Sequence, residues 1–314
     1  MAQNTTLDAV IDGRYRLSAE IGRGSFGTVY KAFDSRENRY VALKVGKLNA
    51  VKSSEVVVMK LLSRHSGFPK LFNSGLAGSC RYISMQLLGA NLQTVVEKRP
   101  LSLLGIGRMF RSILNRLKTM HKKGIVHRDL KLQHFIYDQD NTKLHLTDFG
   151  LSTTYDPERI GSIKVKKSQG SGNPLFCSLR THHYKDTGPV DDVESLTFIA
   201  IYLCQNQLPW DVEMCHSDNL WEVVRNRKEE ALNSKWLQTL PTELAEMLNF
   251  LRSCPSGSFP DYEYLSYLMK QFSSREVKLH KPLPLPQCEN SQDEDDLMST
   301  MVLPLRSKVH PSVL

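Results

Sequence analysis

The chain has 314 residues, of which 40% are hydrophobic and 24% are charged, proportions that are typical of a folded globular protein and exclude wholesale disorder. A chain of this length is expected to form two lobes or two domains. The formal net charge of +8 predicts attraction to acidic partners. The basic residues are spread along the chain and form no known nucleic-acid-binding motif, so a specific nucleic-acid partner is not expected.

Cysteine spacing and the N-terminal segment bear on the cellular compartment. None of the six cysteines has C-x-x-C spacing or histidine partners at zinc-finger intervals, which argues against a disulfide framework and against a zinc site. Residues 1–12 lack the apolar core of a signal peptide, and no run of about 18 apolar residues predicts a membrane span. We therefore expect a cytoplasmic monomer without membrane contacts, with the nucleus as a second compartment.

The N-terminal part of the chain is predicted to be mostly β. Short β-branched runs separated by turn residues predict strands at 15–21, 28–33, 40–45, 70–72 and 82–87. One helix interrupts them, with Ser53 and Ser54 as candidate N-caps and Ser66-Gly67 as its end. A β-rich lobe is the expectation for this region.

After Gly89 the pattern becomes helical. The clearest helix ends at Gly124 and carries an apolar stripe, formed by Ile106, Phe110, Ile113, Leu114, Leu117 and Met120. Further helical segments are predicted at 193–203, 220–224, 244–251 and 264–269. Beyond about Phe272 the chain becomes proline-rich and contains the acidic run Asp293-Glu294-Asp295-Asp296, which predicts a disordered tail.

A glycine-rich motif, Gly22-x-Gly24-x-x-Gly27, lies between the first two predicted strands. A dinucleotide-binding turn would lead into a helix, whereas residues 28–33 favour a strand. We interpret the glycines as a flexible hairpin whose backbone N–H groups cover nucleotide phosphates. A glycine hairpin without a ligand remains the alternative.

Three further motifs follow in an order that resembles protein kinases. Val41-Ala42-Leu43-Lys44 is similar to the V-A-I-K strand, His127-Arg128-Asp129-Leu130-Lys131 to the catalytic loop, and Asp148-Phe149-Gly150 to the metal-binding loop. Alone, Lys44 could be a solvated edge charge. Glu55, on the predicted helix, lies where kinases keep the carboxylate that pairs with this lysine.

The resemblance implies a role for each of these side chains. Asp129 would be the catalytic base for the substrate hydroxyl, Lys131 would stabilise the transferring phosphoryl group, and Lys44 would contact ATP phosphates. Asp148 would hold Mg²⁺, which prefers carboxylate oxygens. His127 is interpreted as a packed structural residue.

Within the kinases, the chain resembles the casein kinase 1 family. Cys177 to His182 replaces A-P-E, Asp191 to Leu196 and Leu208-Pro209-Trp210 follow, and Gln86 to Gly89 and Pro260 to Leu265 add further matches over residues 12 to 273. The resemblance implies an α+β bilobal protein-kinase fold and a non-specific serine/threonine protein kinase. Its expected parts are an N-terminal extension (1–11), a β-rich N-lobe (12–88), an α-rich C-lobe (89–276) and the disordered tail (277–314).

The same resemblance implies an ATP site between the lobes. Met85 would be the gatekeeper, the Gln86 carbonyl and the Leu88 N–H would contact the adenine, and Asp192 would brace the catalytic loop. The nucleotide-binding set is completed by Ile21, Gly22, Gly24, Gly27, Val29, Ala42, Lys44, Glu55 and Ile136.

Two departures from the family concern substrate choice. Leu175 replaces an arginine that helps to bind a phosphate already present on the substrate, and Pro189-Val190 replaces an Arg-Arg pair. Protein substrates are expected, and acidic ones remain open, because Lys164, Lys166, Lys167 and Arg180 could form another anion site. A solvated charge run is an equally good interpretation of these lysines.

A third departure concerns the metal. His134 stands where kinases have the Asn that binds the second Mg²⁺, and Leu132 replaces a proline. Imidazole nitrogen suits Zn²⁺ or Mn²⁺ better than Mg²⁺, so we expect ATP with Mg²⁺ as cofactors and leave Mn²⁺ open. Two functions follow: an active kinase, or a pseudokinase that binds nucleotide as a scaffold or regulator with little turnover.

Overall fold

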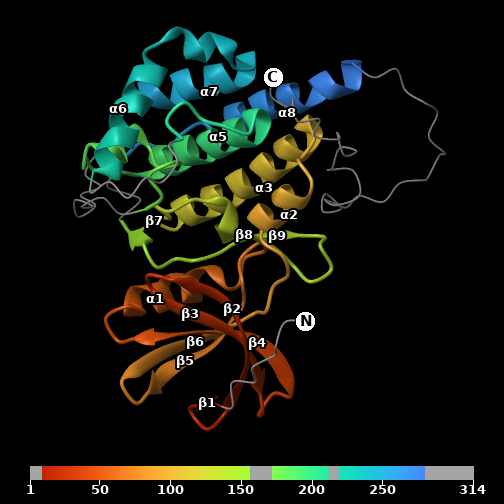
Figure 1. Cartoon of the computed structure of the whole chain (residues 1–314), viewed down its shortest axis with the longest axis vertical. Helices are drawn as coiled ribbons and strands as arrows, with labels where there is room; N and C mark the ends of the chain where they lie inside the picture. Colours follow the sequence, from red (N-terminus) through yellow and green to blue (C-terminus); the bar gives the residue numbers. More distant parts are fainter. Residues whose placement is uncertain (1–8, 156–171, 212–218, 280–314) are drawn as a thin grey trace, which may run out of the picture.

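The computed structural model describes residues 9–155, 172–211 and 219–279 and has two lobes (Figure 1). The strands gather in one lobe and the helices in the other, with the hairpin of β8 (Phe135–Tyr137) and β9 (Leu144–Leu146) on the side of the helical lobe that faces the strands. The predicted α+β bilobal fold is confirmed.

The N-lobe is a six-stranded antiparallel sheet in the order β1-β2-β3-β4-β6-β5. Its strands are β1 (Val10–Ile11), β2 (Tyr15–Gly24), β3 (Gly27–Asp34), β4 (Arg39–Lys47), β5 (Leu71–Ala77) and β6 (Cys80–Met85). Strand β1 pairs with β2, so the last residues of the predicted N-terminal extension belong to the sheet. Strand β5 continues past the predicted 70–72 because its pairing with β6 extends to Ala77.

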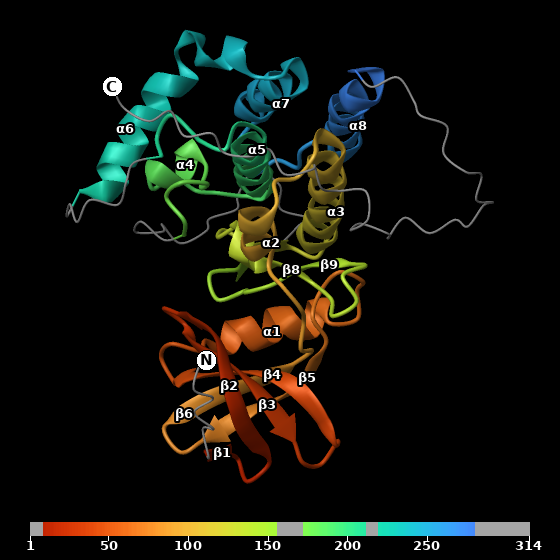
Figure 2. The same cartoon turned by 45° about the vertical axis from the view of Figure 1, so that its right-hand side comes forward.

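Helix α1 (Ser53–Leu62) lies beside this sheet (Figure 2). Lys52 is the N-cap and makes no side-chain cap, so the prediction of Ser53 and Ser54 as N-caps was wrong by one to two residues, and the helix ends before Ser66-Gly67. Its buried face consists of Glu55, Val58, Met59 and Leu62. A carboxylate among three apolar side chains must find a cationic partner, because an isolated buried charge is very costly.

The C-lobe is built around α3 (Leu103–Lys122), whose predicted apolar stripe is fully buried. It packs against α5 (Pro189–Gln205) and α8 (Tyr262–Leu279), and Ser273 Oγ would clash with a Cβ on Gly107, which shows how closely α3 and α8 approach. The other helices are α2 (Leu92–Lys98), α4 (Leu179–His182), α5 (Pro189–Gln205), α6 (Leu220–Leu232), α7 (Thr242–Ser253) and α8 (Tyr262–Leu279), with 3-10 turns η1 (Leu132–His134) and η2 (Lys235–Thr239).

Helix α8 ends at Leu279, three residues inside the predicted tail (277–314). The rest of that tail, 280–314, lies outside the described residues. None of the described helices is long and apolar enough to cross a membrane.

Candidate active site

The catalytic-loop motif lies between β7 (Ile125–Val126) and η1, where its backbone is held by Asp192 from α5. Oδ2 of Asp192 accepts the His127 N–H at 2.7 Å, and Oδ1 accepts the Arg128 N–H at 2.8 Å. His121 Nε2 lies 2.9 Å from the same Oδ2. Burial alone would raise the pKa of Asp192, but these hydrogen bonds and the nearby histidines outweigh it and lower the pKa below its ordinary value.

His127 is fully buried and uses both ring nitrogens. Nδ1 accepts the Asp129 N–H at 3.3 Å, so Nε2 carries the proton and donates to the Thr147 carbonyl at 3.1 Å. Burial lowers the pKa of His127 and keeps the ring neutral. His127 therefore joins the catalytic loop to the strand end that precedes Asp148, which is the structural role expected of it.

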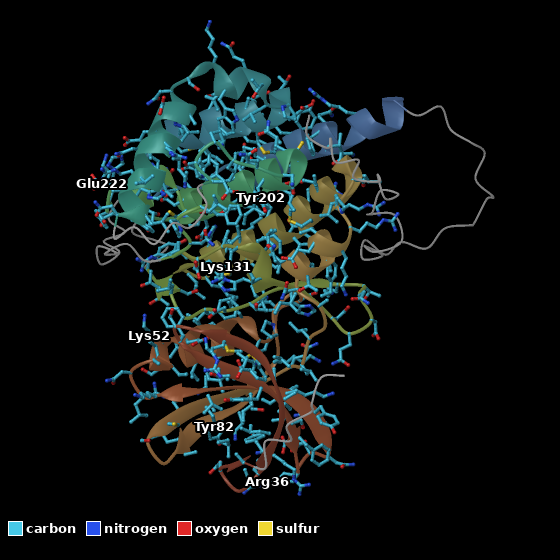
Figure 3. All side chains as sticks on the ribbon, in the orientation of Figure 1. Arg36, Lys52, Tyr82, Lys131, Tyr202 and Glu222 are labelled. Carbon is cyan, nitrogen blue, oxygen red and sulfur yellow. The ribbon has the colours of Figure 1, made fainter. Side chains whose placement is uncertain are left out.

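Asp129 itself is almost buried, and its carboxylate has a cation on one side. Lys131 Nζ lies 3.5 Å from Asp129 Oδ2. On the other side the chain passes very closely at Gly172, where a Cβ would lie 2.8 Å from the Arg128 carbonyl and 3.7 Å from Asp129 Oδ1. Gly172 has φ +108°, so a side chain there would be both strained and obstructed. Figure 3 shows Lys131 at the edge of the helical lobe, toward the strands.

The lysine of β4 joins the two lobes. Lys44 Nζ is 2.6 Å from Glu55 Oε1 on α1 and 3.1 Å from Asp148 Oδ1. Burial would lower the pKa of Lys44, but the two carboxylates outweigh it and raise the pKa. The lysine therefore stays a cation. In the same way, burial would raise the pKa of Asp148, but His134 and Lys44 hold it well below its ordinary value.

His134, the residue that departs from the kinase motif, lies directly beside Asp148. Its Nδ1 is 2.8 Å from the Asp129 carbonyl, which can only accept, so Nδ1 carries a proton. Nε2 then points at Asp148, 3.1 Å from Oδ2. A backbone acceptor that fixes one ring nitrogen and directs the other at the site is the usual arrangement for a metal-binding histidine. When Nε2 carries no proton, His134 and Asp148 present one nitrogen and one carboxylate to a divalent cation.

The predicted adenine-site residues lie on neighbouring strands of the N-lobe sheet, on the segment after β6 and on β8. Register pairs Val29 with Lys44 and Ala42 with Met85, which puts each pair on one face of the sheet. Ile21 falls in an irregularity of the β2–β3 pairing and is 50% exposed. Ile136, on β8, bridges to Asn91 and lies at the lobe boundary.

The segment after β6 leaves its predicted adenine contacts available. The Gln86 N–H donates to the Lys70 carbonyl at 2.9 Å. Within the described part of the chain, neither the Gln86 carbonyl nor the Leu88 N–H makes a backbone hydrogen bond outside the regular elements. Within the described residues this is compatible with their predicted role as adenine contacts.

Sequence reasoning missed one side chain at this site, Phe26 at the tip of the glycine hairpin. Its ring touches Gly150 and lies 5.7 Å from Lys44 Nζ. Gly27, the next residue, has φ +126°, and a Cβ there would lie 2.6 Å from the Val45 carbonyl, so the motif needs glycine at this position. Gly22 and Gly24 occupy the end of β2 on the same hairpin. An aromatic residue inside a G-x-G-x-F-G motif was the available signal.

The predicted anion site is only partly within the described residues. Arg180 is engaged elsewhere: Nε is 3.0 Å from Asp191 Oδ1, and Nη1 donates to the Cys254 carbonyl at 3.1 Å. Its assignment to an anion site was therefore wrong, because a buried carboxylate already uses the guanidinium. Lys164, Lys166 and Lys167 lie outside the described residues.

Comparison with known proteins agrees with this geometry. The model of the protein kinase domain matches residues 15–258. Casein kinase I homolog 2 from Schizosaccharomyces pombe is 26% identical over 272 residues, which cover 83% of this chain and 62% of that protein. The chain thus spans less than two thirds of that relative's length. With the two-lobed fold, the match to the kinase domain shows that the chain belongs to the protein kinase family, and within that family it is similar to a casein kinase I homolog.

Proposed function

We propose that this protein transfers the γ-phosphate of ATP to serine or threonine residues of protein substrates. The observation that supports this proposal is the joined network Glu55–Lys44–Asp148–His134, which ends beside Asp129. A phosphate-binding cation, a metal-binding carboxylate and a base for the substrate hydroxyl thus lie in one place between the lobes.

Each side chain has a task that its contacts suit. Asp129 accepts the proton of the attacking hydroxyl, and its backbone N–H is fixed by His127. Lys131, at 3.5 Å from that carboxylate, is near enough to neutralise charge on the transferring phosphoryl group. Lys44 contacts the nucleotide phosphates, and Glu55 keeps its ammonium directed into the site.

The residues present fit a divalent cation that is shared with the nucleotide. Among the described residues, no three His, Cys, Asp or Glu side chains gather into a free-standing metal site. Asp148 and His134 therefore offer two ligands, and phosphate oxygens and water complete the set. The cation would neutralise charge on the phosphates. Mg²⁺ is the proposed ion, and the nitrogen ligand favours Mn²⁺ as a second one.

A pseudokinase is the second candidate, and one contact favours it. With a proton on Nε2 as well as on Nδ1, His134 becomes an imidazolium that donates to Asp148 at 3.1 Å, so the carboxylate has a cationic partner without a metal ion. If this contact persists with nucleotide bound, the chain would act as a scaffold that binds ATP and turns it over little.

The test is transfer of labelled phosphate from ATP to casein by the purified protein, in Mg²⁺ and separately in Mn²⁺. Transfer that disappears in Asp129→Asn supports the kinase. ATP binding without transfer in either metal favours the pseudokinase, and transfer that persists in Asp129→Asn contradicts the assignment of the base. Acidic protein substrates belong to the same proposal, because the net charge of +8 favours them; a cytoplasmic or nuclear location and a monomeric state are proposed with it.

A further inference from the structure

A fully buried lysine lies beneath the chain segment that leads away from the catalytic aspartate. Lys228, on α6, has no exposed surface. Its Nζ donates to the Cys177 carbonyl at 2.7 Å and to the Pro174 carbonyl at 3.1 Å. Burying an ammonium is very costly unless it is hydrogen-bonded, so this site is built around the charge.

The surroundings of Lys228 compensate the charge without a salt bridge. Its Nζ lies 5.0 Å from the ring centre of Phe198 and 5.1 Å from that of Trp210, within cation–π range. Nε2 of His182 is 3.2 Å away. Among the described residues, no carboxylate comes within ion-pair distance of Lys228. Burial lowers the pKa of Lys228 to about 8, which keeps the ammonium dominant at neutral pH.

The neighbouring backbone is held from the same side. Trp210 Nε1 donates to the Leu175 carbonyl at 2.8 Å, so three carbonyls between Pro174 and Cys177 turn toward α6 and Trp210. We name residues 173–178 the anchored segment. Its ends are also fixed: Asn173 accepts the Leu175 and Cys177 N–H groups, and Ser178 Oγ donates to Asp191 at 2.7 Å.

The anchored segment starts at the catalytic base. At Gly172, which immediately precedes it, an added Cβ would lie 2.8 Å from the Arg128 carbonyl and 3.7 Å from Asp129 Oδ1, so the backbone passes close to the proposed base. A substrate hydroxyl must come within hydrogen-bond reach of Asp129, so the peptide that carries it has to pass along this part of the surface. Small displacements of the segment would therefore move the acceptor and not the nucleotide.

We propose that Lys228 is a positioning residue that fixes the anchored segment as the docking backbone for the acceptor polypeptide. The proposal rests on the proposed function and on the resemblance that places residue 175 beside the protein substrate, and it adds Lys228 as the residue that holds this segment in position. Loss of the ammonium removes the 2.7 Å donor of the Cys177 carbonyl, while the Pro174 carbonyl keeps only its contact with His182 Nε2 at 3.0 Å and the weaker one with Cys177 Sγ, and the segment relaxes.

The test compares Lys228→Met, which keeps the length of the side chain but removes its donors, with Lys235→Met on the exposed side of η2. We expect the KM for casein to rise about tenfold in Lys228→Met, while the KM for ATP stays within about twofold of the unchanged protein. Hydrogen exchange at the Cys177 amide should become faster in the same variant. Lys235→Met should change none of these quantities.

Three results would overturn the proposal. One is an unchanged KM for casein together with unchanged exchange in 173–178; another is a parallel loss of kcat and of affinity for both substrates, which would indicate general unfolding. If Lys228→Met does not fold, Lys228→Gln is the replacement, because it keeps two N–H donors on a shorter side chain. Lys228→Gln should raise the KM for casein by less than tenfold. The third overturning result is a KM for casein that does not rise in Lys228→Gln. If the unchanged protein transfers no phosphate, the proposed function fails, and exchange in the anchored segment alone decides the role of Lys228.

Discussion

The two sides of the catalytic loop differ in how far they keep the kinase arrangement. On the side of α5, Asp192 binds two successive backbone N–H groups, and His127 binds a third. On the side of the metal, η1 carries His134, which bonds to the Asp129 carbonyl and faces Asp148. The backbone hydrogen bonds that hold the catalytic loop, here called the frame, are thus present as the resemblance predicts, while one residue that faces the metal site has changed. A frame held by buried hydrogen bonds can tolerate a ligand change, since the two sides share few partners.

Removal of the proposed base is expected to have the largest effect on phosphate transfer. Asp129→Asn should reduce phosphate transfer to casein by roughly 10²- to 10⁴-fold, because the amide cannot accept the hydroxyl proton. Radiolabel transfer measures the effect, and Asp140→Asn, in the exposed turn before β9, is the matched control. Equal losses in both variants would contradict the special role of Asp129.

Removal of the brace tests whether the frame depends on Asp192. Asp192→Asn should lower the free energy of unfolding by about 3 kcal/mol, because one amide cannot satisfy the three buried donors around it. Urea unfolding measures the change against Asp186→Asn, which alters an exposed carboxylate. A loss below about 1 kcal/mol would show that the frame is held mainly by packing.

Acidification tests the α5 side of the catalytic loop through the protonation of His127. Its folded-state pKa lies below the ordinary value, so the unfolded chain binds more protons below about pH 6.5 and stability falls as the pH drops. Each histidine with a lowered pKa changes the free energy of unfolding by up to about 1.4 kcal/mol per pH unit. The pKa values of His145 and His182 are lowered as well. In His127→Phe, urea unfolding between pH 5 and 7 should lose the slope of one group. An unchanged slope would mean that His127 takes up a proton in the folded state over this range, as it does in the unfolded chain.

Replacement of His134 by the asparagine found in kinases tests the metal side of the catalytic loop. His134→Asn should raise transfer in Mg²⁺ by roughly threefold to tenfold and lower the ratio of Mn²⁺ to Mg²⁺ activity, because an oxygen ligand replaces a nitrogen. Kinetics in each metal measure the ratio, with His65→Asn as the control. Unchanged or lower activity in Mg²⁺ would show that η1 has reorganised around the histidine.

The motifs predicted which residues would meet, and the fold supplied the contacts that no motif contains. Lys44, Glu55 and Asp148 were expected at one site, and Lys44 Nζ lies 2.6 Å from Glu55 and 3.1 Å from Asp148. Phe26 was missed because an aromatic residue in a glycine hairpin has no assigned partner in sequence. Arg180 was misassigned because its partner, Asp191, is eleven residues away on another helix. The role of Lys228 could not be predicted, since a lysine on an amphipathic helix is normally exposed.

The sequence by itself determined the kinase fold, the order of the lobes and the identity of the charged residues at the site, because motif order and hydrophobic periodicity are local properties of the chain. Tertiary structure decided which of those charges face one another. Burial of Glu55 and Lys228 depends on neighbours far away in sequence, and only packing shows whether a buried charge has found donors, acceptors or rings. For His134 the same holds: the sequence named an unusual ligand, and the Asp129 carbonyl decided which of its nitrogens faces Asp148.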